Sequence, residues 1–178
     1  MFQRGASAAG RDCFGVRYWS QFGGANGQAG GLPGASGRSM ELSKYFARES
    51  IDLIVSSECI EHVPDPRQVI KEMASVLKPG GYLSLSTPNR LWQPVVRAAT
   101  ALKLRPFDGY ENFLSWGALR DCLRENHLQI QREFGLHLFP FQLGMRGFSR
   151  WCDARCQTLR GLMINMCVLA RKESGNPQ

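Results

Sequence analysis

The chain has 178 residues, 43% of them hydrophobic, which suits one globular domain with a sizeable core. Its formal net charge is +7, but lysines and arginines are scattered singly, and the only adjacent basic pair is Arg171 and Lys172. The sequence therefore lacks the basic stripe that would predict a nucleic-acid partner. No segment is apolar and long enough for an integral membrane span, and the N-terminus lacks the apolar core of a secretory signal.

The six cysteines carry no metal-binding signature. They form no Cys-x-x-Cys pair, and no histidine lies close enough to complete a zinc set. We therefore expect reduced thiols, no metal site and a cytoplasmic protein.

Residues 1–38 differ from the rest of the chain. Ten of the 19 glycines lie before residue 38, where Ala, Ser, Gln and Gly replace the periodic aliphatic residues of a strand or helix. Three of these glycines resemble a nucleotide-binding loop in spacing, but neither the preceding hydrophobic strand nor the following helix is present. We expect a poorly ordered leader over 1–38, a domain over 39–172 and a disordered tail over 173–178.

The first regular elements begin at residue 51. Residues 51–55 form a short apolar run, typical of a strand that is covered on both faces. Asp65 can cap a helix that starts at Pro66, and the spacing of the following apolar residues predicts that this helix continues to about residue 77. A turn signal at 78–81 and a strand over 82–87 complete a right-handed βαβ unit, which predicts an α/β fold.

The second half of the chain predicts three further elements. Ser115 is a plausible N-cap for a helix that ends near Asn126, and apolar residues at 128, 130 and 134 indicate a strand. Alternation at 162, 164, 166 and 168 predicts the last strand. Because no strong crossover helix separates these two strands, the last strand is expected to return antiparallel.

The stretch IDLIVSSECIEHVPDPRQVIKEMASVLKPGGYLSLSTPN, residues 51–89, resembles a known family. It is similar to the fourth strand, the following helix and the fifth strand of class I S-adenosylmethionine-dependent methyltransferases, in particular the small-molecule enzymes of the ubiquinone biosynthesis O-methyltransferase type. The signatures are Glu61-His62-Val63, the turn at 77–81 and the strand end at 86–89. With the downstream elements, the resemblance covers roughly residues 39–172.

This resemblance implies a partial Rossmann-like sheet, mostly parallel with an antiparallel last strand. It also implies that S-adenosyl-L-methionine lies across the carboxyl ends of the strands. The family's glycine loop and first three strands are not visible, so we expect a truncated or frame-altered methyltransferase. The alternative is a catalytically inactive pseudo-methyltransferase that acts as a binding or stabilising subunit. Either would expose the inner edge of the fourth strand, which predicts a homo-oligomer or a partner chain.

Candidate catalytic residues follow the first strand. His62 is the candidate general base, because its ordinary pKa suits proton transfer near neutral pH, although it could instead orient the loop. Glu61 is expected to assist His62. Glu58 and Glu61 could also hold a divalent ion with His62, or serve only to order the loop.

The resemblance implies that the cofactor is lined by Ser56, Ser57 and Glu58. Glu41 is a candidate substitute for the family's acidic residue at the adenine, or simply an exposed charge. Asn89 is a candidate for substrate contact or a turn residue. Aromatic residues over 89–114 and 136–161, Trp92 and Tyr110 among them, are expected either to wall a small-molecule acceptor or to pack a lid.

Overall fold

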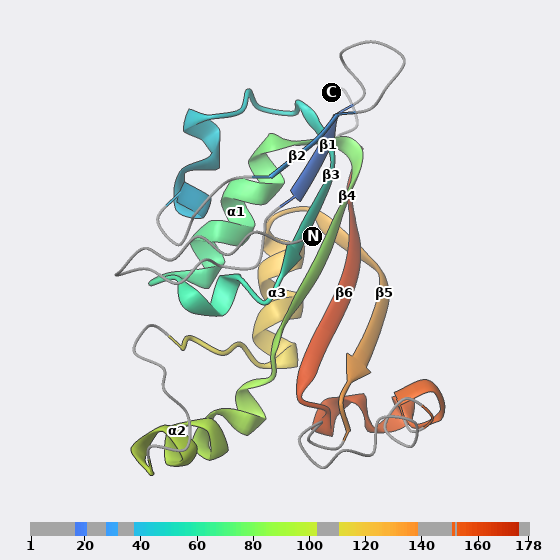
Figure 1. The fold of residues 1–178 in the computed structure, drawn as a ribbon. Coiled ribbons are helices and arrows are strands. Elements are labelled where there is room, and N and C mark those ends of the chain that lie inside the picture. Colours follow the sequence, from blue (N-terminus) through green and yellow to red (C-terminus); the bar gives the residue numbers. More distant parts are fainter. Residues whose placement is uncertain are drawn as a thin grey trace.

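The computed structural model describes residues 17–20, 28–31, 38–102, 111–138, 151 and 153–174. In this part of the chain, six strands form one sheet in the order β2-β1-β3-β4-β6-β5 (Figure 1). The strands are β1 Arg17–Ser20, β2 Gln28–Gly31, β3 Ile51–Ser57, β4 Leu77–Pro88, β5 Leu128–Leu136 and β6 Asn165–Lys172. The α-helices are α1 Pro66–Val76, α2 Gln93–Ala101 and α3 Trp116–Glu125. The 3-10 helices are η1 Arg38–Lys44, η2 Ile60–His62, η3 Arg90–Trp92 and η5 Gln157–Leu162.

The central unit is the predicted βαβ crossover. Strands β3 and β4 pair in parallel, and α1 connects them. Asp65 caps α1, since its side chain accepts hydrogen bonds from Arg67 N at 2.9 Å and from Gln68 N at 3.2 Å. The predicted helix start at Pro66 is therefore confirmed, and the missing N–H of proline leaves no backbone group unsatisfied there.

The predicted turn at 78–81 lies inside β4. Helix α1 ends at Val76, and Leu77 already pairs with Ile51 of β3 before the register shifts. The shift needs small residues: Gly80 has a φ of +79°, and a Cβ on Gly81 would lie 3.0 Å from the carbonyl oxygen of Asp52. These glycines allow the chain to leave a helix and enter a strand within one turn.

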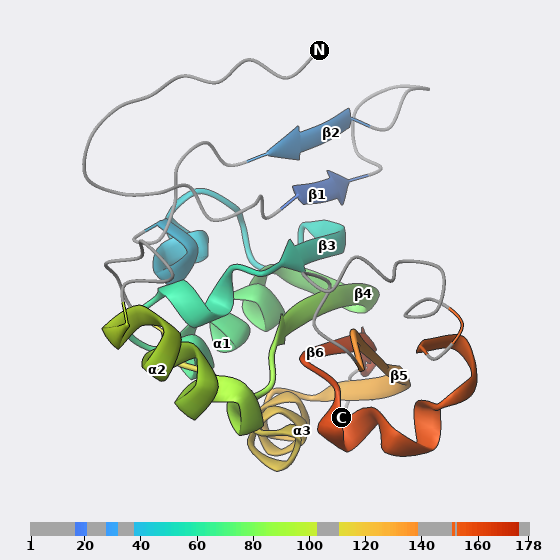
Figure 2. The ribbon, with the colours of Figure 1, turned by 60° about the horizontal axis from the view of Figure 1, so that its bottom comes forward.

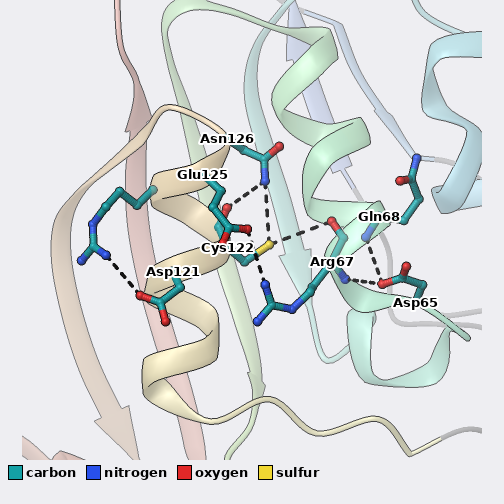
Figure 3. A network of polar contacts seen from close by, with 8 residues as sticks. Asp65, Arg67, Gln68, Asp121, Cys122, Glu125 and Asn126 are labelled. Atoms are coloured by element: carbon teal, nitrogen blue, oxygen red, sulfur yellow. Dashed lines mark hydrogen bonds and ion pairs between the residues drawn. The ribbon is translucent and has the colours of Figure 1, made fainter.

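Helices α1 and α3 cover the same face of the sheet, which we call the helix face (Figures 1 and 2). Ser115 caps α3 by accepting a hydrogen bond from Ala118 N at 3.2 Å, as predicted. The two helices also meet directly, where Arg67 O accepts a weak hydrogen bond from Cys122 Sγ at 4.0 Å (Figure 3). The buried core lies between these helices and the strands, and it includes Ile54, Ile70, Met73, Leu83, Leu85, Leu119, Leu123, Val168 and Ala170.

The last strand returns antiparallel, as predicted. Strand β6 lies between β4 and β5 and runs antiparallel to both. Its predicted start was wrong, because Leu162 ends η5 and Ile164 precedes the first strand residue, Asn165. The pairings give β2, β3, β4 and β5 one common direction, with β1 and β6 opposed. Only β3 and β4 are therefore adjacent parallel strands in the described sheet.

Strands β1 and β2 were not expected from the sequence; they form an antiparallel hairpin inside the segment that was expected to be a leader. Strand β1 pairs antiparallel with β3 from Arg17 opposite Val55 to Trp19 opposite Leu53. The expectation that the inner edge of β3 is exposed was therefore wrong, because the chain covers that edge itself. The predicted tail begins at 173, of which 173 and 174 are described and the rest lies outside the described residues.

No described helix combines the length and the apolar character that crossing a bilayer requires.

Candidate functional site

The candidate site lies at the carboxyl ends of β3 and β4, at the lower end of the sheet in Figure 1. Because the two strands are parallel, both deliver the residues that follow them to the same edge. Helix η2 follows β3 with Glu61 and His62, and η3 follows β4 after Asn89. Glu61 and His62, which carry part of the family resemblance, thus lie at the edge of the sheet where β3 and β4 end, as predicted.

Glu61 is a buried carboxylate that links β4 to His62. Only 1% of its surface is exposed, and its Oε2 accepts a hydrogen bond from Thr87 Oγ1 at 3.1 Å. Its Oε1 lies 3.7 Å from His62 Nε2, whose side chain is 25% exposed. Glu61 is too enclosed to meet a substrate, so it can act only through the groups it holds, whereas His62 remains accessible.

Glu58 follows the last residue of β3 in the left-handed region, with a φ of 48°. Its backbone N–H donates to Ser86 O at 3.0 Å, and Ser86 Oγ donates to its Oε1 at 2.8 Å. Such backbone strain is uncommon outside glycine and concentrates at functional sites. Glu58 is therefore held with its carboxylate turned over the end of β4.

Burial raises the pKa of Glu58 above its usual value. The hydrogen bond from Ser86 opposes this rise, as do the positive charges that His62 and His137 can carry. Asn165, at the start of β6, also donates to the carboxylate. Glu58 is consequently a carboxyl group that holds its proton to a higher pH than an exposed glutamate.

His137 was missed in the sequence analysis. It follows β5 directly, with a φ of 61°, and its carbonyl accepts a hydrogen bond from Ile164 N at 3.1 Å. Ile164 O in turn accepts from Asn89 N at 2.7 Å, so a row of backbone hydrogen bonds joins the ends of β5 and β4. A histidine directly after a strand was the available signal, but its link to Glu58 depends on β6 lying between β4 and β5.

The two predicted serines face opposite sides of the sheet. Ser56 lies in the same register as Leu85 on the helix face, and its buried Oγ has no hydrogen-bond partner among the described residues. Ser57 is exposed on the far face, where its Oγ lies 3.2 Å from Ser86 Oγ. The structure therefore brings Ser57, but not the Ser56 hydroxyl, to the side where Ser86 meets Glu58.

Glu41 is not brought together with these residues. It lies exposed on η1, which packs against α1, and its carboxylate pairs with Lys44 Nζ at 2.7 Å. This geometry agrees with the second interpretation of Glu41, an exposed charge.

Two of the predicted substrate residues, Asn89 and Trp92, donate hydrogen bonds to backbone carbonyls of residues 161–163. Asn89 is 4% exposed, and its amide donates to Gly161 O at 2.8 Å and to Met163 O at 3.2 Å. Trp92 Nε1 donates to Leu162 O at 2.9 Å. Both side chains thus tie the end of β4 to η5 and the approach to β6, a contact that was not predicted for Asn89. Asn89 Oδ1 also accepts a hydrogen bond from Leu91 N at 3.2 Å, which agrees with the alternative interpretation of Asn89 as a turn residue. Tyr110 lies outside the described residues.

Within the described ranges, no group of three or more His, Cys, Asp or Glu side chains could hold a metal ion. The cysteines described there form no disulfide bonds: Cys59, Cys122, Cys156 and Cys167. Burial, and then the charge of Glu58, raise the pKa of Cys167 to about 11, so this thiol stays protonated beside the site.

Strands β4 and β5 run in one direction with the antiparallel β6 between them, and ionisable residues follow the carboxyl end of β3. This mixed α/β arrangement defines a class I methyltransferase fold. A family model described as a methyltransferase domain matches residues 8–133, more than half of the chain, which therefore belongs to this family. S-adenosylmethionine is the cofactor of the family. The match begins inside the segment that the sequence analysis had set apart as a leader.

One curated relative is the ubiquinone biosynthesis O-methyltransferase of Xanthomonas campestris pv. campestris, 38% identical over 107 residues. That match covers 57% of this chain and 45% of the relative, so the chain spans about half the length of the curated proteins it matches.

Solved structures confirm the fold. A methyltransferase of Thermotoga maritima matches with a TM-score of 0.52 at 18% identity, over 72% of this chain and 59% of that one. A methyltransferase of Methanosarcina mazei matches with a TM-score of 0.51 at 20% identity, over 76% of this chain and 64% of that one.

Proposed function

We propose that this chain forms part of an enzyme that transfers the methyl group of S-adenosylmethionine to a hydroxyl oxygen of a small molecule. The observation that carries the proposal is the joint position of Glu58 and His62 at the carboxyl end of β3, beside the end of β4. Membership of the methyltransferase family supports the reaction class, and the O-methyltransferase names of the curated relatives support oxygen as the accepting atom.

The residues on the far face of the sheet suit the polar parts of the donor. Ser57 offers an exposed hydroxyl, and Ser86 and Glu58 add a second hydroxyl and a carboxylate within one hydrogen-bonded group. These groups can bind hydroxyl and amino groups, and the carboxylate can lie near a positive charge. When bound, the donor supplies a methyl group activated on a sulfonium.

His62 is proposed to take the proton that the acceptor hydroxyl loses. The buried carboxylate of Glu61, held by Thr87, would stabilise the imidazolium that results. Glu61 is thereby a positioning residue rather than a catalytic one. General-base catalysis of this kind contributes typically about 10²–10⁴ in rate.

Two measurements on the same variants test the proposal. Titration calorimetry with S-adenosylmethionine should show saturable binding that Ser57→Ala weakens and that Glu41→Gln leaves unchanged. Transfer of a labelled methyl group to a panel of small phenols should fall by about 10²-fold or more in His62→Ala, with donor binding retained. Absence of donor binding at millimolar concentration would contradict the proposal. Donor binding without transfer in the wild type would instead favour the inactive binding subunit.

A further inference from the structure

A pocket lies between the start of α1 and the segment η3–α2, and its lining includes none of the candidate catalytic residues Glu58, Glu61 and His62. Its volume is about 380 Å³, at the lower end of the range of small-ligand pockets. Three arginines from three elements line it: Arg67 in the first turn of α1, Arg90 in η3 and Arg97 in α2. Asp65 is the one acidic residue among the lining side chains, so their formal charges leave an excess of two positive charges.

The one carboxylate of the pocket is already committed. Asp65 Oδ1 accepts from the backbone N–H groups of Arg67 and Gln68, so it serves the helix cap. The N-terminus of α1 is consequently satisfied by its own cap and supplies no free site for an anion. Any attraction for an anion must come from the arginine side chains.

The arginines differ in how they are held. Arg67 Nη1 lies 3.5 Å from Glu125 Oε2 of α3 (Figure 3). Both side chains are exposed, so this ion pair adds little to stability. Neither Arg90 nor Arg97 has a side-chain hydrogen bond or an ion pair with a residue of the described ranges, and both are exposed. Within the described part of the chain, two guanidinium groups are therefore uncommitted, with a third loosely held nearby.

Hydrogen bonds join the segments that form the walls of the pocket. Asn112 Nδ2 donates to Val63 O at 2.7 Å and to Pro64 O at 3.1 Å, which ties the segment before α3 to the loop before α1. Gln93 Nε2 donates to Glu111 O at 2.7 Å and fixes the start of α2 to the same segment. Phe113, 8% exposed, adds an apolar lining. The site thus combines an apolar wall with fixed elements that carry positive charge.

We propose that this pocket binds a small organic phosphate, with Arg90 and Arg97 holding its oxyanion. Guanidinium groups bind phosphate oxygens in paired hydrogen bonds, and the excess of two positive charges matches a phosphate dianion. The volume leaves room for an organic group against Phe113. The site does not depend on methyl transfer, and binding here can be measured without donor or acceptor.

The test is titration of the full chain with inorganic phosphate and with glycerol 3-phosphate, followed by backbone-amide NMR shifts and calorimetry. Both ligands should bind saturably, glycerol 3-phosphate more tightly. Arg90→Ala with Arg97→Ala should weaken binding by about tenfold or more. The affinity of the double variant Arg90→Lys, Arg97→Lys should lie between those of the wild type and the double alanine variant, because lysine keeps the charge but loses the paired hydrogen-bond geometry.

The matched control is Arg48→Ala with Arg132→Ala, which removes the same net charge from exposed arginines elsewhere and should leave binding within about twofold. Equal loss in the control would show a general charge effect and overturn the site. No saturable binding of either phosphate, or binding only to vesicles containing anionic lipid, would overturn it as well. Thermal melting of each variant separates loss of the site from loss of the fold.

Discussion

Thr87, near the end of β4, donates a hydrogen bond of 3.1 Å to Glu61, a carboxylate of η2 that is 1% exposed. This contact joins the two strand ends that carry the candidate site. It is also a hydrogen bond in a buried setting, where loss of one partner leaves the other unsatisfied.

Replacement of Thr87 by valine keeps the shape of the side chain but removes this donor. We expect a loss of about 1–3 kcal/mol in the free energy of unfolding, because the buried acceptor is left unsatisfied. Urea unfolding measures it, with Thr100→Val as the control, since Thr100 donates to Val96 O on the partly exposed helix α2. Equal effects in the two variants would show that Glu61 is not held as described.

Gly135, on β5, is expected to tolerate no side chain. A Cβ there would lie 2.5 Å from Met163 Sδ and 2.8 Å from Met163 Cβ, and Met163 is fully buried. Gly135→Ala should therefore cost about 1–3 kcal/mol through forced repacking. Gly161→Ala is the matched control, because a Cβ at Gly161 meets nothing within 4 Å. A neutral Gly135→Ala variant would contradict the close approach of η5 to β5.

Asp65→Ala should remove the cap of α1 and destabilise the protein by about 0.5–2 kcal/mol. Asp121→Ala removes an exposed carboxylate of α3 that pairs with Arg124, and its cost should stay below about 1 kcal/mol. Chemical unfolding of the two variants compares a capping carboxylate with a surface one. If Asp121→Ala proved the more damaging, the assignment of Asp65 as the cap would fail.

Glu58 predicts a pH dependence of stability. Burial raises its pKa, so the folded state binds the proton more tightly than the unfolded chain does. The stability that this proton confers is present below the unfolded pKa of about 4.5 and is lost as the pH rises through the raised pKa of the folded state. Glu58→Gln should therefore gain stability relative to the wild type as the pH rises.

Urea unfolding of Glu58→Gln and the wild type between about pH 4 and pH 8 measures this difference, which amounts to about 1.4 kcal/mol for each unit of pKa shift. Ser86→Ala removes a hydrogen bond that lowers the pKa of Glu58, and it should make the stability fall more steeply with pH. A stability difference that shrinks with rising pH would reverse the sign and contradict the burial of Glu58.

Local signals were enough to predict the central unit of the fold. The cap at Asp65, proline at the first helical position and the apolar stripe act within a few residues of each other, and they placed the start of α1 correctly. Ser115 acted in the same way for α3. The position of Glu58, Glu61 and His62 on the rim followed from a strand that ends in ionisable residues.

Several features that depend on distant parts of the chain were not predicted. Strand β1 forms by pairing its backbone with β2 and β3, and such pairing does not require the apolar alternation that was missing from residues 1–38. The approach of His137 to Glu58 depends on the insertion of β6 between β4 and β5. Leu162 and Ile164 alternated like strand residues, yet Leu162 belongs to the 3-10 helix that approaches β6.

The most direct test of the central claim is to map, by amide chemical shifts, where S-adenosylmethionine binds on the chain. Shifts concentrated at Ser57, Glu58 and His62, with Asp52 at the opposite end of β3 unaffected, are the predicted result. Shifts centred on the amino end of β3, or saturating ligand with no change at its carboxyl end, would contradict it.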